Sequence, residues 1–241
     1  MSGSPKLLAL GDAAWTVEFG DAIAPDVHAR VMALAAAVET LGEPAVLDLV
    51  PTFRSLTVHF DPLAIDGAGL GRRLLAAAAG AAGSEVAGRR WRLPACFGGG
   101  FGPDLPAVAE EAGITEGAAV ELLAGAELRV FMIGFMPGFP YMGGLPDILH
   151  RPRLATPRLK VPARSVAIAG AMAAVYPWES PGGWRLLGRT PLRLFDAGNA
   201  ARPALLAPGD TVRLLPVGED EYGRLEAEAA AGRLDPEVWL G

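Results

Sequence analysis

The sequence predicts an α+β N-terminal domain followed by a mainly-β C-terminal domain with the character of a β-barrel. Three observations lead to this fold class. Residues 7–82 alternate between strand-like and helix-like patterns, residues 80–88 are small and polar, and β-branched and aromatic runs separated by Pro and Gly dominate after Leu128. A chain of 241 residues is long enough for two separate cores. We therefore expect domains at 1–86 and 87–241.

The N-terminal domain is predicted to begin with a strand around Trp15, where apolar and polar residues alternate. A helix follows at 27–41, because apolar residues recur there at spacings of four and three and Gly42 ends the pattern. The other expected elements are two strands and a helix, at 45–50, 56–60 and 68–79. This order predicts helices packed on one face of a small antiparallel sheet.

The C-terminal domain is predicted to hold helices between its first strand and the remaining strands. Asp104 is a candidate N-cap for a helix that Gly113 closes, and Thr115 begins the next one. A last helix is expected at 220–231. The predicted strands are 91–97, 129–133, 165–168, 192–195 and 211–215.

Composition narrows the class of function. Hydrophobic residues make up 51% of the chain and charged residues 20%, as in globular proteins. The net charge of −6 argues against non-specific nucleic-acid binding. The apolar stretch at 7–10 is too short for a signal peptide or a membrane span, so we expect a cytoplasmic protein. Cys96 and three scattered histidines offer no metal-ligand spacing, and no metal site is predicted.

The run 134–146 contains four glycines and three prolines with aromatic residues between them. This composition favours a rigid loop over a pocket, because proline restricts the loop and glycine permits close backbone approach. Gly138, Phe139 and Tyr141 are its candidate substrate-binding residues. A surface turn with buried aromatic side chains explains the run equally well.

Two further segments carry candidate binding groups. The run 151–162 places four arginines and lysines in an acidic chain, and guanidinium groups suit a carboxylate or a phosphate; a solvated basic loop is the alternative. The segment 176–184 holds Gly182 and Gly183, whose consecutive N–H groups are candidates for an oxyanion hole. Ser180 lacks the Gly-x-Ser-x-Gly frame of a nucleophile elbow, and no Gly-x-x-x-x-Gly-Lys phosphate loop is present.

Four phrases, in this order and spacing, resemble one protein family. They are Gly-Phe-Met-Pro-Gly-Phe-Pro-Tyr, Pro-Arg-Leu-Lys-Val-Pro-Ala, Tyr-Pro-Trp-Glu-Ser-Pro-Gly-Gly-Trp and Gly-Arg-Thr-Pro-Leu. The chain is similar to the family of allophanate hydrolase subunit 1, KipI and the 5-oxoprolinase B-subunit, also described as a carboxyltransferase C and D subdomain. The resemblance covers nearly the whole chain and is strongest at 97–196.

The resemblance implies a cyclophilin-like β-barrel in the C-terminal domain. It also implies a heteromeric enzyme that opens 5-oxoproline to glutamate with ATP, formed with a homologue of the 5-oxoprolinase C-subunit or of allophanate hydrolase subunit 2. ATP is expected to bind with, or to, that partner. A KipI-type member inhibits a sensor histidine kinase instead, which is the alternative function. Prolyl isomerisation rests on the fold alone and ranks last.

The candidate site residues fall into two groups. Ser165, Tyr176 and Ser180 are the predicted catalytic residues, with orienting or proton-handling roles, and Arg158 and Arg189 are the predicted carboxylate or phosphate binders. The full predicted substrate-binding set is Gly138, Phe139, Tyr141, Arg158, Gly182, Gly183, Trp184, Arg189 and Thr190.

Three positions depart from the family pattern. Arg164 stands where a glycine is expected, Met172-Ala173-Ala174 where a Gln-Thr-Gly run is expected, and Leu123 where a histidine is expected. The second change deletes hydrogen-bonding groups, while Arg164 adds a donor fork. We hypothesise that the pocket is remodelled, either for a different substrate or for no catalysis.

Overall fold

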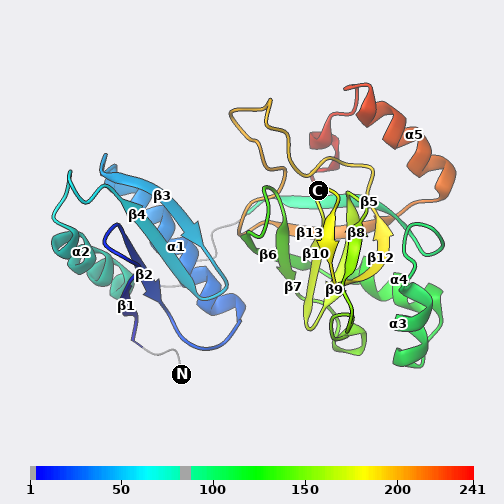
Figure 1. The fold of residues 1–241 in the computed structure, drawn as a ribbon, viewed down its shortest axis with the longest axis horizontal. Helices are drawn as coiled ribbons and strands as arrows, with labels where there is room; N and C mark the ends of the chain where they lie inside the picture. The colour runs from blue at the N-terminus through cyan, green and yellow to red at the C-terminus, as the bar shows by residue number, and fades with distance from the viewer. Residues whose placement is uncertain (1–3, 82–87) are drawn as a thin grey trace. The chain divides into compact units, whose positions relative to one another are not determined.

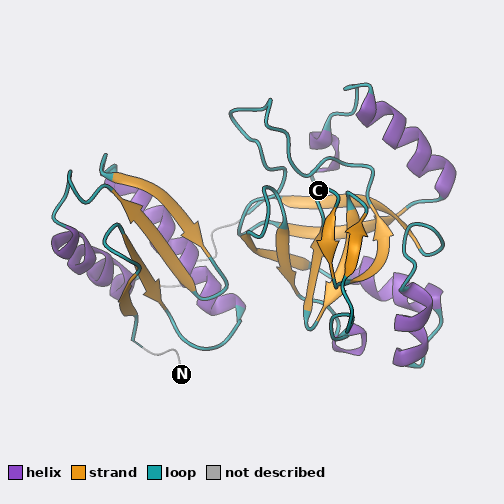
Figure 2. Ribbon diagram, in the orientation of Figure 1, coloured by secondary structure: helices purple, strands orange, loops and turns teal. Residues whose placement is uncertain are grey.

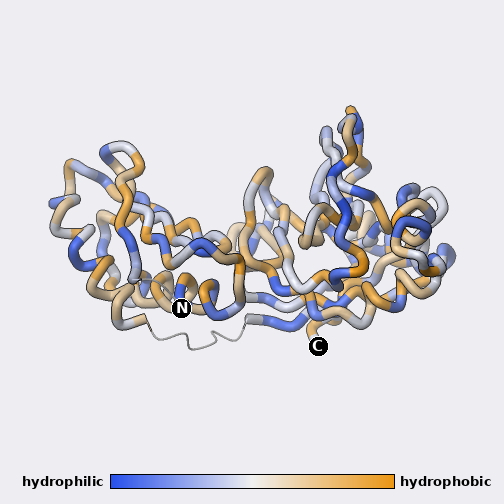
Figure 3. Tube along the Cα trace, turned by 90° about the horizontal axis from the view of Figure 1, so that it is seen from below, coloured by the Kyte–Doolittle hydropathy of each residue, from blue (hydrophilic) through white to orange (hydrophobic). Residues whose placement is uncertain are grey.

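The computed structural model describes residues 4–81 and 88–241. The chain divides into two compact units, Met1–Ala87 and Gly88–Gly241 (Figure 1). The predicted domain boundary at residue 86 lies outside the described residues. Apolar and polar stretches alternate along the trace of both units (Figure 3), as expected when each buries its own core.

The first unit is a four-stranded antiparallel sheet with two helices on one face (Figure 2). Val17 and Leu56 are buried on the helix-covered face, while Thr16 and Thr57 bond each other at 2.8 Å on the opposite one. Gly42 ends the first helix in the left-handed conformation, as its sequence position predicts. The sheet order is β1-β2-β4-β3, and the elements are β1 (Lys6–Ala9), β2 (Ala14–Glu18), α1 (Pro25–Leu41), β3 (Val46–Pro51), β4 (Ser55–Phe60) and α2 (Gly67–Gly80).

The second unit is built around a closed barrel of seven strands in the order β10-β7-β6-β13-β5-β12-β9. β13 and β5 run parallel, and the other neighbours in the barrel are antiparallel. A separate two-stranded ribbon is formed by β8 and β11. The strands are β5 (Arg90–Phe97), β6 (Leu128–Ile133), β7 (Pro140–Gly143), β8 (Arg158–Val161), β9 (Ser165–Ala169), β10 (Met172–Val175), β11 (Ser180–Gly182), β12 (Arg185–Arg189) and β13 (Thr211–Pro216).

Three helices and two short 3-10 turns complete this unit. α5 is drawn above the barrel in Figure 1 and α3 below it. Thr115 caps α4 by accepting a hydrogen bond from Ala118 N, as predicted. The elements are α3 (Leu105–Ala112), α4 (Glu116–Gly125), η1 (Asp147–Leu149), α5 (Glu219–Ala230) and η2 (Pro236–Trp239).

Two local predictions are wrong. Residues 192–195 form no strand: Leu192 and Leu194 are buried in alternation, but the segment makes only the isolated bridge from Phe195 to Ala204. Asp104 occupies the N-cap position of α3 without capping it, because its carboxylate is bound elsewhere. The sequence correctly indicated that Leu192 and Leu194 are buried and that Asp104 makes polar contacts. Contacts with distant residues, which the local sequence does not show, determine the backbone conformation and the hydrogen-bond partner.

The barrel wall formed by β9, β10 and β12 separates two hydrophobic cores. Val166, Ile168 and Val175 belong to the core inside the barrel. Ala167 and Ala174, at the alternate positions, belong to a second core that also contains Val161 of the ribbon. Successive strand residues face opposite sides of a sheet, so this second core lies on the outer face of the wall beneath the β8–β11 ribbon.

Candidate functional site

The second core is an aromatic cluster centred on Phe139. This residue lies within the Gly-Pro-rich run, immediately before β7, and is 1% exposed. Its ring contacts those of Phe135, Tyr141, Tyr176 and Trp184, at centroid distances of 5.4, 4.9, 5.1 and 5.9 Å. Four of the predicted site residues are thus brought together from distant parts of the second unit.

The run 134–146 is part loop and part strand. Pro140–Gly143 forms β7 and pairs with both β6 and β10, so the prediction of a loop throughout is wrong. Gly138 has φ of 77°, and a Cβ atom there would lie 2.8 Å from Phe195 Cβ. Only glycine fits this turn, which delivers Phe139 into the cluster.

Gly182 makes room for the side chain of Tyr176. A Cβ atom on Gly182 would overlap the tyrosine hydroxyl and lie 2.9 Å from Cζ. Gly182 also lies in β11, opposite Arg158 of β8. Burial raises the pKa of Tyr176, partly offset by the backbone N–H of Trp184, so the hydroxyl keeps its proton at neutral pH.

Gly183 is less crowded. Its carbonyl accepts a hydrogen bond from Leu154 N at 2.7 Å, and a Cβ atom there would meet Leu154 O and Pro157 only at ordinary contact distances. Neither Gly182 nor Gly183 has a positive φ. Gly182 therefore serves packing against Tyr176 and ribbon pairing, whereas Gly183 bonds Leu154 through its backbone; the role of both glycines as anion donors stays a prediction.

Arg158 is held by Asp104. One guanidinium nitrogen lies 2.6 Å from Asp104 Oδ1, and Oδ2 of the same carboxylate accepts a hydrogen bond from Leu186 N at 2.6 Å. Asp104 is 8% exposed, so this pair is largely removed from water. The pair ties the ribbon, the start of α3 and β12 together, and it neutralises the charge that was predicted to bind substrate.

Arg153 also lies beside the cluster. Its guanidinium carbon lies 5.8 Å from the ring centroid of Trp184. Burial raises the pKa of Tyr141, and the positive charge of Arg153 partly counteracts that increase. Arg153 belongs to the same basic run as Arg158, but sequence spacing alone does not distinguish an arginine with a carboxylate partner from one beside an aromatic ring.

Three other predicted site residues, Ser165, Arg189 and Thr190, use their side chains to bond nearby backbone, and Ser165 O also accepts a hydrogen bond from Tyr176 N at 2.9 Å. Ser165 is buried and its hydroxyl donates to Pro162 O at 2.7 Å. Arg189 Nε donates to Ala163 O at 3.1 Å, and Thr190 Oγ1 accepts from Leu192 N at 3.2 Å. Ser165 and Arg189 are register partners of β9 and β12. Their chemical roles stay predictions.

Ser180, in β11, differs from these residues. Among residues 4–81 and 88–241, its Oγ is buried without a hydrogen-bond partner. A buried hydroxyl without a partner loses free energy on desolvation, which makes this atom a candidate for bonding to a ligand. Within the same described residues, no group of three or more His, Cys, Asp or Glu side chains is placed to bind a metal ion.

Residues 5–206 match the family model of the carboxyltransferase domain, subdomain C and D. The chain belongs to this carboxyltransferase subdomain family. It is 36% identical over 234 residues to the B-subunit of 5-oxoprolinase from Bacillus subtilis strain 168, covering 91% of this chain and 96% of the relative. It is 43% identical over 179 residues to the B-subunit of 5-oxoprolinase from Escherichia coli O157:H7, covering 73% of this chain and 80% of the relative.

Solved structures of similar proteins share the fold. The crystal structure of TTHA0988 matches with a TM-score of 0.76 and 35% identity over 85% of this chain, which spans only 40% of that longer chain. A conserved uncharacterized protein from Pyrococcus horikoshii matches over its full length and 90% of this chain, with 39% identity and a TM-score of 0.54. The K. lactis urea amidolyase, at 23% identity and a TM-score of 0.78, supports the fold alone.

The three positions that were expected to depart from the family pattern have distinct structural settings. Arg164 has φ of 67°, a left-handed conformation that favours the glycine expected there. Its guanidinium donates to Pro191 O at 3.1 Å and pairs with Glu226 of α5. Leu123, on α4, is fully buried in the hydrophobic core of the second unit, whereas Met172 packs on the aromatic cluster. Of the three, only the change at β10 alters the cluster itself.

No helix among the described residues is both long and apolar enough to cross a membrane.

Proposed function

We propose that this chain is the B-subunit of a 5-oxoprolinase, a heteromeric hydrolase that opens the cyclic amide of 5-oxoproline to glutamate at the expense of ATP. The observation that carries the proposal is the 36% identity to a 5-oxoprolinase B-subunit over 91% of this chain and 96% of the relative. A match over nearly the whole of both chains supports the same subunit role more strongly than a shared fold.

The aromatic cluster is the proposed site for the substrate. Tyr141 is partly exposed, and its ring lies 5.9 Å from that of the buried Trp184, so it offers an aromatic face for the CH2 groups of a small lactam ring. Arg153 is the proposed partner of the substrate carboxylate, because Arg158 is already paired with Asp104. Ser180 Oγ and the protonated hydroxyl of Tyr176 are the proposed hydrogen-bonding groups for the amide.

The partner and the nucleotide belong to the same proposal. The partner is a homologue of the 5-oxoprolinase C-subunit, and ATP binds with it or at a site it shares with this chain. The exposed apolar side chains around the cluster support a docking role: Phe135 is 66% exposed, Leu159 of the ribbon 88% and Trp178 48%. A cyclophilin-like character of the barrel, a domain division at residue 86 and a cytoplasmic location complete the proposal.

The test begins with co-expression of this chain and a C-subunit homologue, followed by size-exclusion chromatography. ATP hydrolysis by the complex is then measured with and without 5-oxoproline. Hydrolysis that depends on 5-oxoproline is the expected result. A stable complex without such dependence would refute 5-oxoproline as the substrate and favour a remodelled pocket.

Arg153→Gln tests the site within the active complex. Loss of one charge-assisted contact predicts a KM for 5-oxoproline raised by about tenfold or more, with little change in kcat. Arg233→Gln removes the same charge from an exposed position of the same unit and is expected to leave both constants unchanged. Equal effects of the two substitutions would exclude a specific role for Arg153.

A regulatory protein of the KipI type remains the second candidate, because it too needs an exposed apolar surface such as that of Phe135, Leu159 and Trp178. It requires no C-subunit homologue. Failure to form the complex, together with binding to the dimerisation domain of a histidine kinase, would favour this function over the hydrolase.

A further inference from the structure

A cleft of about 520 Å³ lies on the outer face of the barrel wall formed by β5 and β13. This is a different part of the wall from the aromatic cluster, which involves β7, β9, β10 and β12. Arg90, Arg92 and Arg213 line the cleft, together with Glu127, Ala124 and Leu215. None of these residues has a role in the proposed hydrolase site.

The strand register brings the arginines together. β5 and β13 are parallel, with Arg90 opposite Thr211 and Arg92 opposite Arg213. Side chains two residues apart on a strand share a face at roughly 7 Å, and neighbouring strands lie about 5 Å apart. Three guanidinium groups therefore rise from one small patch of sheet.

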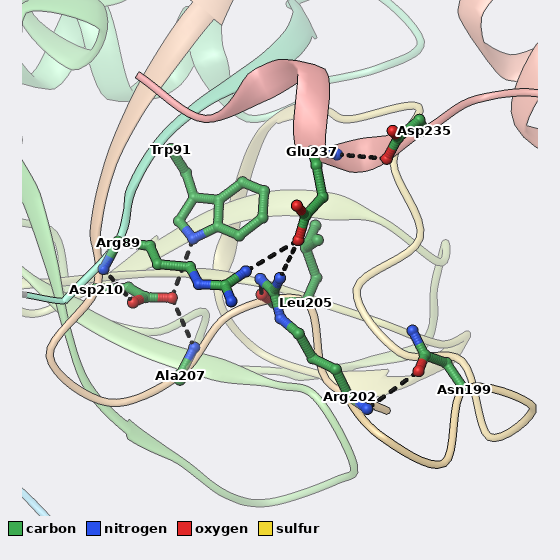
Figure 4. Close-up of polar contacts among 9 residues, drawn as sticks. All are labelled: Arg89, Trp91, Asn199, Arg202, Leu205, Ala207, Asp210, Asp235 and Glu237. Carbon is green, nitrogen blue, oxygen red and sulfur yellow. Dashed lines mark hydrogen bonds and ion pairs between the residues drawn. The ribbon is translucent and has the colours of Figure 1, made fainter.

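A buried carboxylate fixes this register. Asp210, just before β13, accepts hydrogen bonds from Arg89 N at 2.8 Å and from Trp91 Nε1 at 3.0 Å (Figure 4). Asp210 is 3% exposed, and Thr211 N also donates to Arg89 O at 2.9 Å. The starts of the two strands are thus joined, so the backbone positions that carry the arginines are fixed before any ligand arrives.

The charges of the cleft are not balanced by the protein. Arg89 and Arg202, which do not line the cleft, both donate hydrogen bonds to Glu237, at 3.0 and 2.7 Å (Figure 4). Arg213 has a partner in Glu127 at 2.7 Å. In contrast, within residues 4–81 and 88–241 the side chains of Arg90 and Arg92 make no hydrogen bond or ion pair.

This pattern is unusual for the chain, which has 27 acidic and 21 basic residues. Neighbouring arginines repel each other, so a protein with more carboxylates than cations is expected to place a carboxylate beside each of them. Arg213 is paired with Glu127, and Gly241, the last residue of the sequence, also lines the cleft. Among the described residues of the cleft, Arg90 and Arg92 are therefore the two cations without a side-chain partner, and a bound ligand with two negative charges would pair with both.

We propose that this arginine cleft binds a small doubly charged oxyanion, with Arg90 and Arg92 as its principal ligands and Arg213 as a third contact. Planar guanidinium groups donate paired hydrogen bonds to carboxylate or phosphate oxygens. Ala124 and Leu215 offer an apolar border for a short carbon skeleton attached to the charged group. The site is independent of the aromatic cluster and of the hydrolase reaction.

Binding is tested by isothermal titration calorimetry on the full chain, with inorganic phosphate and with glutarate as separate probes. At least one probe is expected to bind with a millimolar or lower Kd. Phosphate alone would identify a phosphate-type ligand, glutarate alone a dicarboxylate, and both a general dianion site. The absence of binding by either probe up to about 20 mM would overturn the proposal.

Variants locate the site. Arg92→Gln is expected to weaken binding by roughly tenfold or more, since it removes a charged hydrogen-bond donor. Arg233→Gln, which removes the same charge from an exposed position outside the cleft, is the control. Equal weakening by both substitutions would show general attraction to the surface and would overturn the proposal.

A substitution that is expected to strengthen binding serves as a second test, because a variant that merely fails to fold cannot bind more tightly. Glu127→Gln releases Arg213 and removes the negative charge of the cleft, so it is expected to tighten binding several-fold. Glu110→Gln is its control, at an exposed position outside the cleft. Side-chain NMR of arginine Nε–H groups should show Arg90 and Arg92 signals shifting on titration; unchanged signals during binding would overturn their assignment.

Discussion

Two parts of the barrel wall differ in how they use their outer face. All five residues of β9 are buried, because the β8–β11 ribbon and the aromatic cluster cover that side of the wall. β5 begins with alternating exposed and buried residues, and exposed Arg213 lies between two buried residues of β13. One barrel therefore carries a dry aromatic surface on one arc and a charged, open surface on another. The function proposed for the first arc depends on packing, and the function proposed for the second depends on charge.

Phe139→Ala should show the largest difference between the two arcs. Phe139 is 1% exposed and contacts four aromatic rings, so truncation leaves a cavity and should lower the free energy of unfolding by about 3–5 kcal/mol. Arg92→Ala, on the open arc, should change it by less than about 0.5 kcal/mol. Urea denaturation followed by circular dichroism measures both. If Phe139→Ala lowered the free energy of unfolding no more than Arg92→Ala, the stability of the dry arc would not depend on packing around Phe139.

Asp104→Asn tests the ion pair that anchors the dry arc. The substitution leaves Arg158 without its carboxylate and weakens the acceptor for Leu186 N, which predicts a loss of about 2 kcal/mol in unfolding free energy. The matched change on the open arc is Glu127→Gln, whose partner Arg213 is 58% exposed. Solvent screening there predicts a loss below about 1 kcal/mol. If Glu127→Gln lowered the free energy of unfolding more than Asp104→Asn, the ion pair on the open arc would matter more to stability than the pair on the dry arc, contrary to the prediction.

Gly182→Ala and Gly183→Ala separate two glycines that the sequence cannot tell apart. A Cβ atom at Gly182 overlaps the side chain of Tyr176, so we expect a cost of about 1–3 kcal/mol from overpacking. At Gly183 the nearest atoms are 3.6 Å away, and the change should cost less than about 1 kcal/mol. Thermal unfolding of the two variants gives the comparison. Similar melting temperatures would show that Tyr176 has room to move.

The long, regularly patterned elements could be predicted from sequence. Alternation around Trp15 and the helical spacing before Gly42 correspond to β2 and α1. The short strands of the dry arc could not, because Pro140 and Gly182 are typical turn residues and three to five residues contain no measurable period. Those strands exist because barrel closure supplies partners for their backbone groups, which is information spread over the whole second unit.

The residues of the aromatic cluster could be predicted from sequence to the extent that they are aromatic or glycine, whereas their roles in a site stay predictions. Phe139 and Trp184 meet because Gly-Pro turns bring distant segments together, and their unusual composition is visible in the sequence. The role of Arg158 was not visible, since its partner Asp104 lies 54 positions away and has the sequence setting of a helix cap. The sequence shows where the arginines are, but only the tertiary structure shows which of them are paired with a carboxylate and which are available to a ligand.

The smallest expected effect is a pH dependence that belongs to the dry arc. Burial raises the pKa of Tyr176 above its ordinary value of 10.0. In the unfolded chain the hydroxyl ionises near pH 10, while in the folded chain it keeps its proton, so the folded state binds more protons above that pH. The stability contributed by the buried neutral hydroxyl is complete below about pH 10 and declines as the pH rises through the folded-state pKa.

Tyr176→Phe should therefore flatten the decrease in unfolding free energy between about pH 9.5 and 11, around the ordinary tyrosine pKa. The slope is the informative quantity, because it is independent of any constant loss from the missing hydroxyl. Arg92→Gln on the open arc should leave the slope unchanged, since arginine stays charged throughout this range. If Tyr176→Phe left the slope of unfolding free energy against pH unchanged, the hydroxyl of Tyr176 would be hydrated in the folded protein. The dry arc would then not include this hydroxyl.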